Sequence, residues 1–302
     1  MKNYNHVDEK YLDLIEEVLE NGTTKDDRTK VGTISSFGHF LKFDLSKGFP
    51  ILTTKKVNFD IVKDECLWFF VKGSTNINDL QEKSRIIWKD WASEDGSLGA
   101  IYGKQARQWT SYHKYSRDVY TKLTKNINNY FETLTLENGF IKYEVDQIKR
   151  IIWLLKNDPN SRRIVLNLWN VGELPLQNLP CCHYTSVFNV NQGKLNCHVT
   201  LRSNDLFLGN PFNISSYALL TNLLAHCCDL EVGELALSIV DAHIYSNHVD
   251  QVKLQLSRYD KMKELPTLYL NPNKKDFFSF GLDDISLIGY EYEAYIKAPI
   301  AV

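Results

Sequence analysis

The segment from Asn213 to Cys228 is apolar on nearly every side of a helical projection. A helix of this kind has no face suited to water, so other parts of the chain have to cover it on all sides. With 302 residues, the chain is long enough to enclose such a helix in one large core. We therefore expect a buried central helix with the remaining elements packed around it.

Other patterns in the chain predict a mixture of helices and strands. Residues 184–190 and 195–201 alternate around the turn Asn191-Gln192-Gly193, which is typical of a β-hairpin. Periodicity and turn residues further predict helices at 7–19, 59–71 and 245–256, two strands turning at Gly38 within 31–45, and strands at 164–169 and 235–240. Strands interspersed with helices indicate an α+β fold with a mixed β-sheet.

The chain has neither internal repeats nor a linker rich in glycine, serine or proline, which predicts a single catalytic domain spanning residues 1–302. Residues 110–145 are polar and rich in Lys, Asn and Tyr. We expect them to form a surface insertion, partly helical, rather than a second catalytic domain.

Composition excludes several classes of protein. The formal net charge of -2 argues against binding of long nucleic acid. There is no apolar run of about 20 residues that could span a membrane, and the N-terminal residues lack the apolar core of a secretory signal. Six cysteines, two pairs of them adjacent in sequence, fit neither a disulfide scaffold nor a zinc site. A reducing cytoplasm is the expected location.

Three chemically distinct side chains lie within about thirty residues of one another. Cys182 supplies a thiol, Arg202 a guanidinium and Asn213 a carboxamide. A thiolate attacks electrophilic carbon, an arginine holds phosphate through two parallel hydrogen bonds, and an amide can read the edge of a base. This combination predicts covalent chemistry on a nucleotide.

The series of motifs that surrounds these residues resembles the folate-dependent thymidylate synthase family. The resemblance runs from about Tyr11 to Val302, apart from the stretch between Trp109 and Asp146. Its motifs, in one order along the chain, are Arg28-Thr-Lys-Val-Gly32, Phe49-Pro-Ile-Leu-Thr-Thr-Lys55, Ser161-Arg-Arg163, Trp169-Asn-Val-Gly-Glu-Leu174, Cys182-His183, Arg202-Ser-Asn-Asp205, Pro211-Phe-Asn213 and His243-Ile-Tyr-Ser-Asn-His248.

The resemblance implies reductive methylation of dUMP to dTMP, with 5,10-methylenetetrahydrofolate as carbon and hydride donor and without a metal. Cys182 would add to C6 of the uracil and make C5 nucleophilic, which requires a depressed thiol pKa. Cys181 stands where many members have proline. Cys182 is the better match because its spacing to Arg202, Asn213 and His243 needs no gap.

The resemblance also implies how dUMP would be held. Phosphate would be bound by Arg28, Arg202 and Ser203 of one subunit and by Arg162 and Arg163 of the partner, in a homodimer whose sheets pack back to back. Asn213 would read the uracil, although an N-cap of the following helix is an alternative role. His243 and Tyr245 would bind the sugar hydroxyl, although simple burial is the alternative for both.

The folate side follows from the same resemblance. An acid in the apolar run 64–69 has to be paired or carry a raised pKa, which suits Glu65 to proton relay. Tyr102 and His183 would lie near the nucleophile, Asp205 would contact the pterin, and Lys55 would meet the glutamate tail. The C-terminal Val302 would close the site. The remaining folate contacts would be Ile87, Trp88, Leu179, Gly209 and Phe212.

Two other functions are compatible with parts of this pattern. The first is a deoxyuridylate hydroxymethylase, in which water takes the place of hydride. The second is a non-catalytic nucleotide- or RNA-binding homologue, against which the joint presence of Glu65, Cys182, Asn213 and His243 argues. The chain also departs from the commonest family pattern at five positions, which are Ala106, Asn210, Ile239, Val240 and Ala242.

Overall fold

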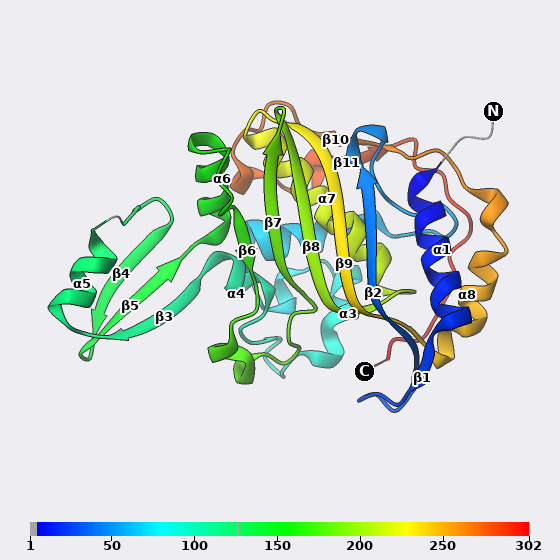
Figure 1. The fold of residues 1–302 in the computed structure, drawn as a ribbon, viewed down its shortest axis with the longest axis horizontal. Coiled ribbons are helices and arrows are strands. Elements are labelled where there is room, and N and C mark those ends of the chain that lie inside the picture. The colour runs from blue at the N-terminus through cyan, green and yellow to red at the C-terminus, as the bar shows by residue number, and fades with distance from the viewer. Residues whose placement is uncertain (1–4, 126, 302) are drawn as a thin grey trace.

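The computed structural model describes residues 5–125 and 127–301 and has an α+β fold, as the sequence predicts (Figure 1). Its main sheet has six strands in the order β1-β2-β9-β8-β7-β6, and all neighbours are antiparallel except β8 and β9. These strands are β1 (Thr23–Lys25), β2 (Thr33–Asp44), β6 (Val165–Asn167), β7 (His183–Asn191), β8 (Lys194–Asp205) and β9 (Glu231–Tyr245).

Helices cover one side of this sheet and its ends (Figure 1). They are α1 (His6–Asn21), α2 (Phe59–Cys66), α3 (Glu82–Trp88), α4 (Tyr102–Arg107), α5 (Arg117–Thr124), α6 (Gln147–Asn157), α7 (Gly209–Cys227) and α8 (Val249–Leu256). A small hairpin of β10 (Thr267–Leu270) and β11 (Ile285–Ile288) completes the body.

The expected central helix is confirmed as α7, which packs against β8, β9 and α2. Thirteen of its 19 residues are buried, so the apolar pattern on all sides reflects cover on all sides. The helix begins at Gly209, not at Asn213. In the described part of the chain, no helix combines the length and the apolar character needed to cross a membrane.

The expected hairpin is confirmed as β7 and β8, whose last ladder pair is Asn191 with Lys194. The two residues between them, Gln192 and Gly193, have φ angles of 51° and 74°. Positive φ at both central positions is the mark of a type I′ turn, whose twist matches that of the flanking strands. This turn therefore sets the register of β8 against β7, in which residues 201–205 form the end of β8.

Two expectations are wrong. The segment 31–45 is one strand, β2, and not two strands turning at Gly38: this glycine has a φ of 82°, but the pairing with β9 resumes in register beyond it. The expected helix at 245–256 begins only at Val249, because β9 continues to Tyr245 and a 3₁₀ turn over Ser246–His248 follows it. The helix expected at 59–71 is confirmed, with an α-helix over Phe59–Cys66 that continues as a π-helix over Leu67–Lys72.

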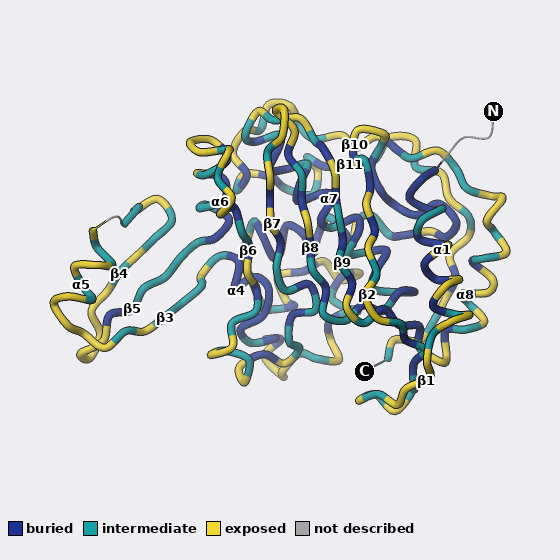
Figure 2. Tube along the Cα trace, viewed as in Figure 1, coloured by how far each residue is buried: buried dark blue, intermediate teal, exposed yellow. Residues whose placement is uncertain are grey.

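The main sheet has one covered face and one open face. Alternate residues of β8 and β9 are fully buried against α7, whereas Phe40, Val187 and Val240 are exposed on the other face of the strands. In Figure 1 the sheet lies in front of α7, and none of the helices drawn crosses the side toward the viewer. The tube in Figure 2 alternates between buried and exposed colours along these strands. One broad face of the sheet is therefore available to a partner.

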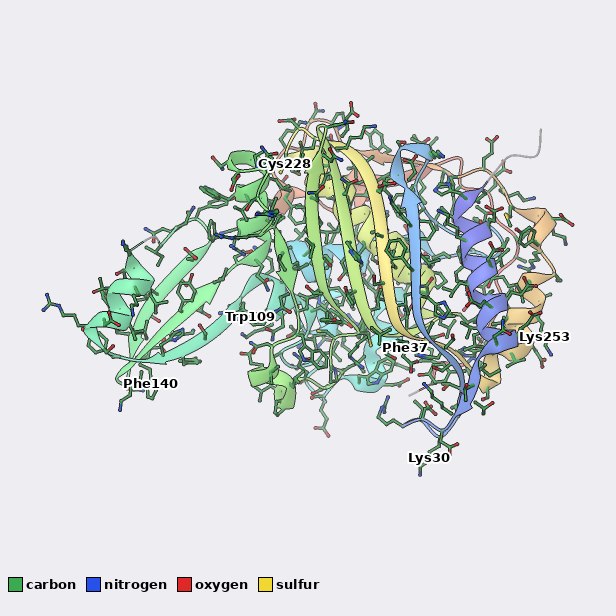
Figure 3. All side chains as sticks on the ribbon, in the orientation of Figure 1. Lys30, Phe37, Trp109, Phe140, Cys228 and Lys253 are labelled. Atoms are coloured by element: carbon green, nitrogen blue, oxygen red, sulfur yellow. The ribbon has the colours of Figure 1, made fainter. Side chains whose placement is uncertain are left out.

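The insertion is an arm that projects from the body and is built mainly from strands (Figures 1 and 3). Its sheet has the order β3-β5-β4, with β3 (Trp109–Lys114), β4 (Glu132–Glu137) and β5 (Phe140–Val145), and α5 is its one helix among the described residues. Figure 3 shows Trp109 at its base and Phe140 far from the body. The expectation of partial helix is confirmed, but strands dominate.

The arm should be dispensable for folding. Thr110 and Glu144 are paired across β3 and β5, so an Asn-Gly turn replacing residues 111–143 can close the chain there without moving either end. We expect a cooperative unfolding transition with a melting temperature within a few degrees of wild type, since almost all buried residues lie outside the arm.

Arg107→Ala, at the base of the arm, is the variant to compare with the shortened chain. Arg107 makes an ion pair with Asp146 at 2.9 Å and donates to the carbonyls of Phe70 and Val71. Its loss should lower the free energy of unfolding by about 2–4 kcal/mol in urea titrations. Loss of cooperativity in the shortened chain would show that the arm belongs to the folding core.

Candidate active site

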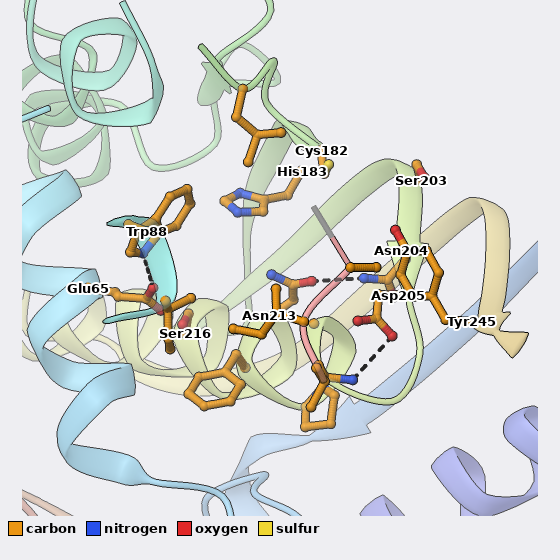
Figure 4. A pocket seen from close by; sticks show the side chains of 18 of the residues that line it. Glu65, Trp88, Cys182, His183, Ser203, Asn204, Asp205, Asn213, Ser216 and Tyr245 are labelled. Carbon is orange, nitrogen blue, oxygen red and sulfur yellow. Dashed lines mark hydrogen bonds between the residues drawn. The ribbon is translucent and has the colours of Figure 1, made fainter. Parts of the chain in front are cut away.

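A cavity of about 1110 Å³ opens at the carboxyl ends of β8 and β9 and beside the first turn of α7 (Figure 4). The parallel pairing of the strands sets Ser203 opposite Asp241 and Asp205 opposite His243. Because the strands run in the same direction, their final residues converge on one edge of the sheet. Segments almost forty residues apart in sequence therefore supply one wall.

The structure brings together nearly all of the site residues expected from the sequence. The cavity is lined by Arg28, Lys55, Glu65, Ile87, Trp88, Tyr102, Leu179, Cys182, His183, Arg202, Ser203, Asp205, Gly209, Phe212, Asn213, His243 and Tyr245. Arg162 and Arg163 do not line it, and Val302 lies outside the described residues. The neighbouring Ala301 does border it.

Cys182 is held at the cavity wall by its main chain. Its N–H donates to the Tyr102 hydroxyl at 2.8 Å, and its carbonyl accepts from the Arg202 N–H at 2.9 Å. The Arg202 side chain donates from Nη2 to Cys182 Sγ at 3.5 Å and to the Pro180 carbonyl at 2.8 Å. Cys181, by contrast, is fully buried in the hydrophobic core. The structure therefore favours Cys182 as the reactive thiol.

The thiol pKa differs from the sequence-based expectation. Burial raises the pKa of Cys182, and the Arg202 guanidinium opposes that rise. Burial also raises the pKa of Cys181 to about 12 and that of Cys228 to about 11. All six cysteines are free, and Cys182 is the one with an arginine within hydrogen-bond distance of its sulfur. Arg202, together with the Tyr102 hydroxyl, therefore favours the thiolate at this position.

An aromatic stack lies behind the thiol. The Tyr102 and His183 rings are stacked with centroids 4.2 Å apart, and His183 Nδ1 lies 2.7 Å from the Tyr217 hydroxyl. Burial lowers the pKa of His183 to about 3, so the imidazole is neutral at physiological pH. This stack fixes the Tyr102 hydroxyl beneath the Cys182 main chain, while His183 acts as a neutral wall rather than as a base.

Glu65 is both paired and shifted in pKa, as an acid in an apolar helix has to be. It lies on α2, is 8% exposed, and its Oε1 accepts a hydrogen bond from Trp88 Nε1 (Figure 4). Burial raises its pKa to about 7, against the opposing effect of the Trp88 hydrogen bond. A carboxyl with this pKa exchanges a proton readily near neutral pH. Trp88 thus belongs to the cavity wall and orients Glu65.

Asn213 is not a helix cap. It stands inside α7, whose N-cap residue is Leu208, and its Oδ1 accepts from Asn204 Nδ2 at 2.9 Å. In Figure 4 the amide nitrogen of Asn213 lies on the side away from Asn204, among the cavity side chains. Asn204 also lines the cavity and was not expected from the sequence. A single Asn in a strand carries no local signal of such a contact.

The end of β9 presents two aromatic side chains. His243 Nδ1 lies 3.1 Å from Asp241 Oδ1, and Lys25 pairs with the other oxygen of Asp241 at 3.2 Å. The His243 hydrogen bond, assisted by Lys25, lowers the Asp241 pKa to about 2. Tyr245 packs edge-on against His243 with ring centroids 5.2 Å apart. Asp241, two residues from His243 on the same strand face, was not expected from the sequence.

Lys55 lies in the cavity wall, where its side chain contacts Phe207. Its ammonium donates to the Phe207 carbonyl and lies 3.6 Å from the centroid of the Phe207 ring. Burial lowers its pKa to about 7, and Asp205 opposes this. A side chain held in this way fixes the turn before α7, where Asp205 Oδ1 accepts the Phe207 and Leu208 N–H groups.

The cationic residues fall into two groups. Arg28 and Arg202 line the cavity, with Arg28 presented by a turn in which Asp27 accepts the Gly32 N–H at 2.9 Å. Arg162 and Arg163 are exposed, in the turn that leads into β6 at the edge of the main sheet. The sequence-based expectation of a turn here is confirmed, with Ser161 N–H donating to the Asp158 carbonyl.

The five departures from the family pattern lie outside the cavity lining. Ala106, Ile239, Ala242 and Asn210 are buried, and Val240 points to the open face of the sheet. Asn210 still reaches the site indirectly, since its Nδ2 donates to Asn204 Oδ1. Among residues 5–125 and 127–301, no cluster of three His, Cys, Asp or Glu side chains is arranged to hold a metal ion.

Glu65→Gln should change stability in a pH-dependent way. At low pH the carboxyl is protonated in the folded and unfolded chain alike. As pH rises from about 4.5 to about 7, the unfolded chain releases this proton first, so wild type loses stability relative to the variant. The gap should reach on the order of 3 kcal/mol above pH 7. Urea unfolding across this range measures it.

The control for this experiment is Asp60→Asn, which removes an exposed carboxylate from the same helix. Its effect should stay within about 0.5 kcal/mol at every pH. A difference between wild type and Glu65→Gln that does not vary with pH would contradict the raised pKa of Glu65.

Comparison with known protein families gives one match. The family model described as Thymidylate synthase matches residues 9–302, which is nearly the whole chain. The match includes the arm and every residue that lines the cavity.

Proposed function

Because this chain belongs to the thymidylate synthase family, we propose that it methylates dUMP reductively to dTMP, with 5,10-methylenetetrahydrofolate as co-substrate. One observation carries the proposal: the Cys182 thiol, the Arg202 guanidinium and the Asn213 amide line a single cavity. A nucleophile, an anion-binding group and a base-reading group in one space are what covalent chemistry on a nucleotide requires.

The nucleotide would bind with its phosphate toward the arginines and its base toward α7. Arg28 and Ser203 would contact the phosphate. The N–H groups of the Arg202 guanidinium that do not donate to the Cys181 and Pro180 carbonyls would do the same. His243 and Tyr245 would donate to or accept from the sugar hydroxyl. Asp241 supports this role, because it holds the His243 ring through Nδ1 and leaves Nε2 for the ligand.

The first chemical step would be addition of the Cys182 thiolate to C6 of the uracil. The Sγ–C6 bond forms, the C5–C6 π pair shifts toward C4, and negative charge develops on O4 as an enolate. Arg202 favours the thiolate, and Asn213 Nδ2 can donate to O4 as its charge grows. C5 is then the nucleophile toward the one-carbon unit, and the proton on C5 has to be lost once the new bond forms. Delivery of hydride to the attached methylene group, with expulsion of the thiolate from C6, restores the C5–C6 double bond and Cys182.

The residues on the other side of the cavity suit a flat, aromatic co-substrate. Trp88 and Phe212 offer ring surfaces, Ile87 and Leu179 offer aliphatic cover, and Asp205 offers a carboxylate. When bound, the folate supplies a one-carbon unit and a hydride. Glu65 can take up or release a proton near neutral pH in the same space. A cavity of about 1110 Å³ is large for a single small ligand, which supports two substrates.

The chain's C-terminal segment would help to exclude water. Tyr295, Ala298, Ile300 and Ala301 border the cavity, and the Pro299 carbonyl lies 2.7 Å from His248 Nε2. This contact draws the segment to the 3₁₀ turn Ser246–His248, which directly follows His243 and Tyr245 at the end of β9. A closed site keeps water from competing with hydride for a reactive methylene group, which favours methylation over hydroxymethylation.

A homodimer would complete the phosphate site. Phe40, Val187 and Val240 are exposed on the open sheet face, and Phe40 is 59% exposed. A second copy of the chain packed on this face would cover them. Arg162 and Arg163 are exposed beside the edge strand of the same sheet, from which they would reach across to the other copy's cavity.

The test of the reaction is product analysis after incubation with dUMP and 5,10-methylenetetrahydrofolate. Wild type should yield dTMP with dihydrofolate. Cys182→Ala should abolish turnover yet retain dUMP binding, because the phosphate and sugar contacts do not use the thiol. Cys181→Ala, the adjacent control, should keep substantial activity with a modest loss of stability, since that side chain is buried in the core.

Other outcomes of this assay have definite meanings. Hydroxymethyl-dUMP with tetrahydrofolate as the main product would identify a hydroxymethylase. No product and no nucleotide-dependent adduct would leave a binding protein. An inactive Cys181→Ala together with an active Cys182→Ala would overturn the choice of nucleophile.

Two inactive variants should complement each other if the phosphate site is shared. In a heterodimer of Cys182→Ala with Arg162→Ala, one of the two sites has both the thiol and the donated arginine. A fully exchanged equal mixture should recover activity in roughly a quarter of all sites. Arg117→Ala, an exposed arginine on the arm, is the control that should be active alone. Continued inactivity after demonstrated subunit exchange would rule out a shared site.

A further inference from the structure

We propose that Asn204 and Asn210 fix the direction in which the Asn213 carboxamide faces the cavity, and thereby set the preference of this chain for uracil over cytosine. Both would be positioning residues that act through Asn213. The inference rests on the proposed function, because it concerns the base that Asn213 reads.

Three asparagine side chains form a one-way relay of hydrogen bonds between β8 and α7. Asn210 Nδ2 donates to Asn204 Oδ1, and Asn204 Nδ2 donates to Asn213 Oδ1 at 2.9 Å. Asn210 is fully buried and Asn204 is 3% exposed. Figure 4 shows the last of these contacts as a dashed line from Asn204 to Asn213. Every donor in the relay therefore points toward the cavity.

The direction matters because a carboxamide is nearly symmetric in shape but opposite in chemistry at its two ends. With Oδ1 bonded to Asn204, Asn213 Nδ2 is available to the ligand, and no group of residues 5–125 and 127–301 accepts from it. Nδ2 can donate to O4 of uracil, and the second lone pair of Oδ1 can accept from N3–H. Cytosine has a donor and an acceptor at these two positions in the reverse order.

Turning Asn213 over would suit cytosine, and Asn204 prevents it. The turned amide would place Nδ2 against Asn204 Nδ2, two donors facing each other with no acceptor between them. Asn204 could relieve this conflict only by turning over as well, which would then set its Nδ2 against the donor of Asn210. The three amides can therefore turn only together, and that concerted turn would place the Asn210 amide nitrogen where its unpaired oxygen now lies, in a buried position where an unpaired N–H is less tolerated than an unpaired C=O.

Asn210 has no other evident role in the fold. Its Oδ1 is buried without a hydrogen-bond partner in the described part of the chain. A buried, unpaired oxygen is costly, and an aliphatic residue would avoid it at this position of α7. What the amide adds is the donor that orients Asn204.

The most direct test reverses the polarity of the central residue. In Asn204→Asp, an ionised carboxylate accepts from Asn210 and can accept from Asn213 Nδ2, which turns the Asn213 oxygen toward the ligand. Dissociation constants for dUMP and dCMP, measured by calorimetry without folate, give the preference as a ratio. Relative to wild type, the ratio should move toward dCMP by roughly tenfold or more at pH 8.

Two features separate orientation from a general structural effect. A protonated carboxyl can donate to Asn213 Oδ1 as asparagine does, so the shift should shrink at pH 6. Asn204→Leu, of similar volume, should lower dUMP affinity and bring the two constants closer together. A packing defect alone would weaken both nucleotides equally and leave the ratio unchanged. Asn210→Leu should change the ratio in the same direction with little loss of thermal stability.

The outcomes distinguish this inference from the function on which it rests. A wild type that binds dUMP no better than dCMP would contradict the proposed function itself. A wild type that prefers dUMP, with an unchanged ratio in both Asn204→Asp and Asn210→Leu, would overturn the relay and leave the function standing. If Asn204→Asp unfolds, Asn210→Leu alone decides.

Discussion

The parallel pairing of β8 with β9 is the constraint on which the site depends. Parallel neighbours need a long crossover, and here the crossover is α7, which the sheet and α2 bury. The same connection therefore both buries α7 and brings the ends of β8 and β9 together. The cavity side chains gather where β8 ends, α7 begins and β9 ends. A substitution that disturbs the packing around α7 would therefore displace these side chains as well as destabilise the fold.

Burial also determines the electrostatics of the cavity. The same removal from water raises the pKa of Glu65, keeps His183 neutral and raises the pKa of Cys182. Only the last of these works against the proposed chemistry, and Arg202 and the Tyr102 hydroxyl counter it. In the proposed reaction Arg202 would thus act both at the thiol and at the phosphate, and a bound phosphate would compete with the thiolate for its charge.

The sequence predicts those parts of the fold that follow from local pattern. The all-round apolar run of α7 and the Gln192-Gly193 turn are such cases, and both are confirmed. A turn is predicted at Gly38 because glycine accommodates a positive φ both in a turn and inside a strand. Only the register with β9 shows that the strand continues through it. The sequence predicts the arm only as a partly helical surface insertion, on its polar composition, although Ile141, Tyr143 and Val145 alternate along β5 as strand residues do. Asn204 and Asn210 could not be foreseen, since their contact joins a strand to a helix.

The main chain of Cys182 is tied on both sides, to the Tyr102 hydroxyl through its N–H and to the Arg202 N–H through its carbonyl. The sulfur is then left with one degree of freedom, rotation about the Cα–Cβ bond among three staggered positions. As the proposed nucleophile, Cys182 would reach and leave the substrate carbon without loop movement and with little reorganisation of the backbone. Its motion would be limited only by side-chain rotation in a packed wall.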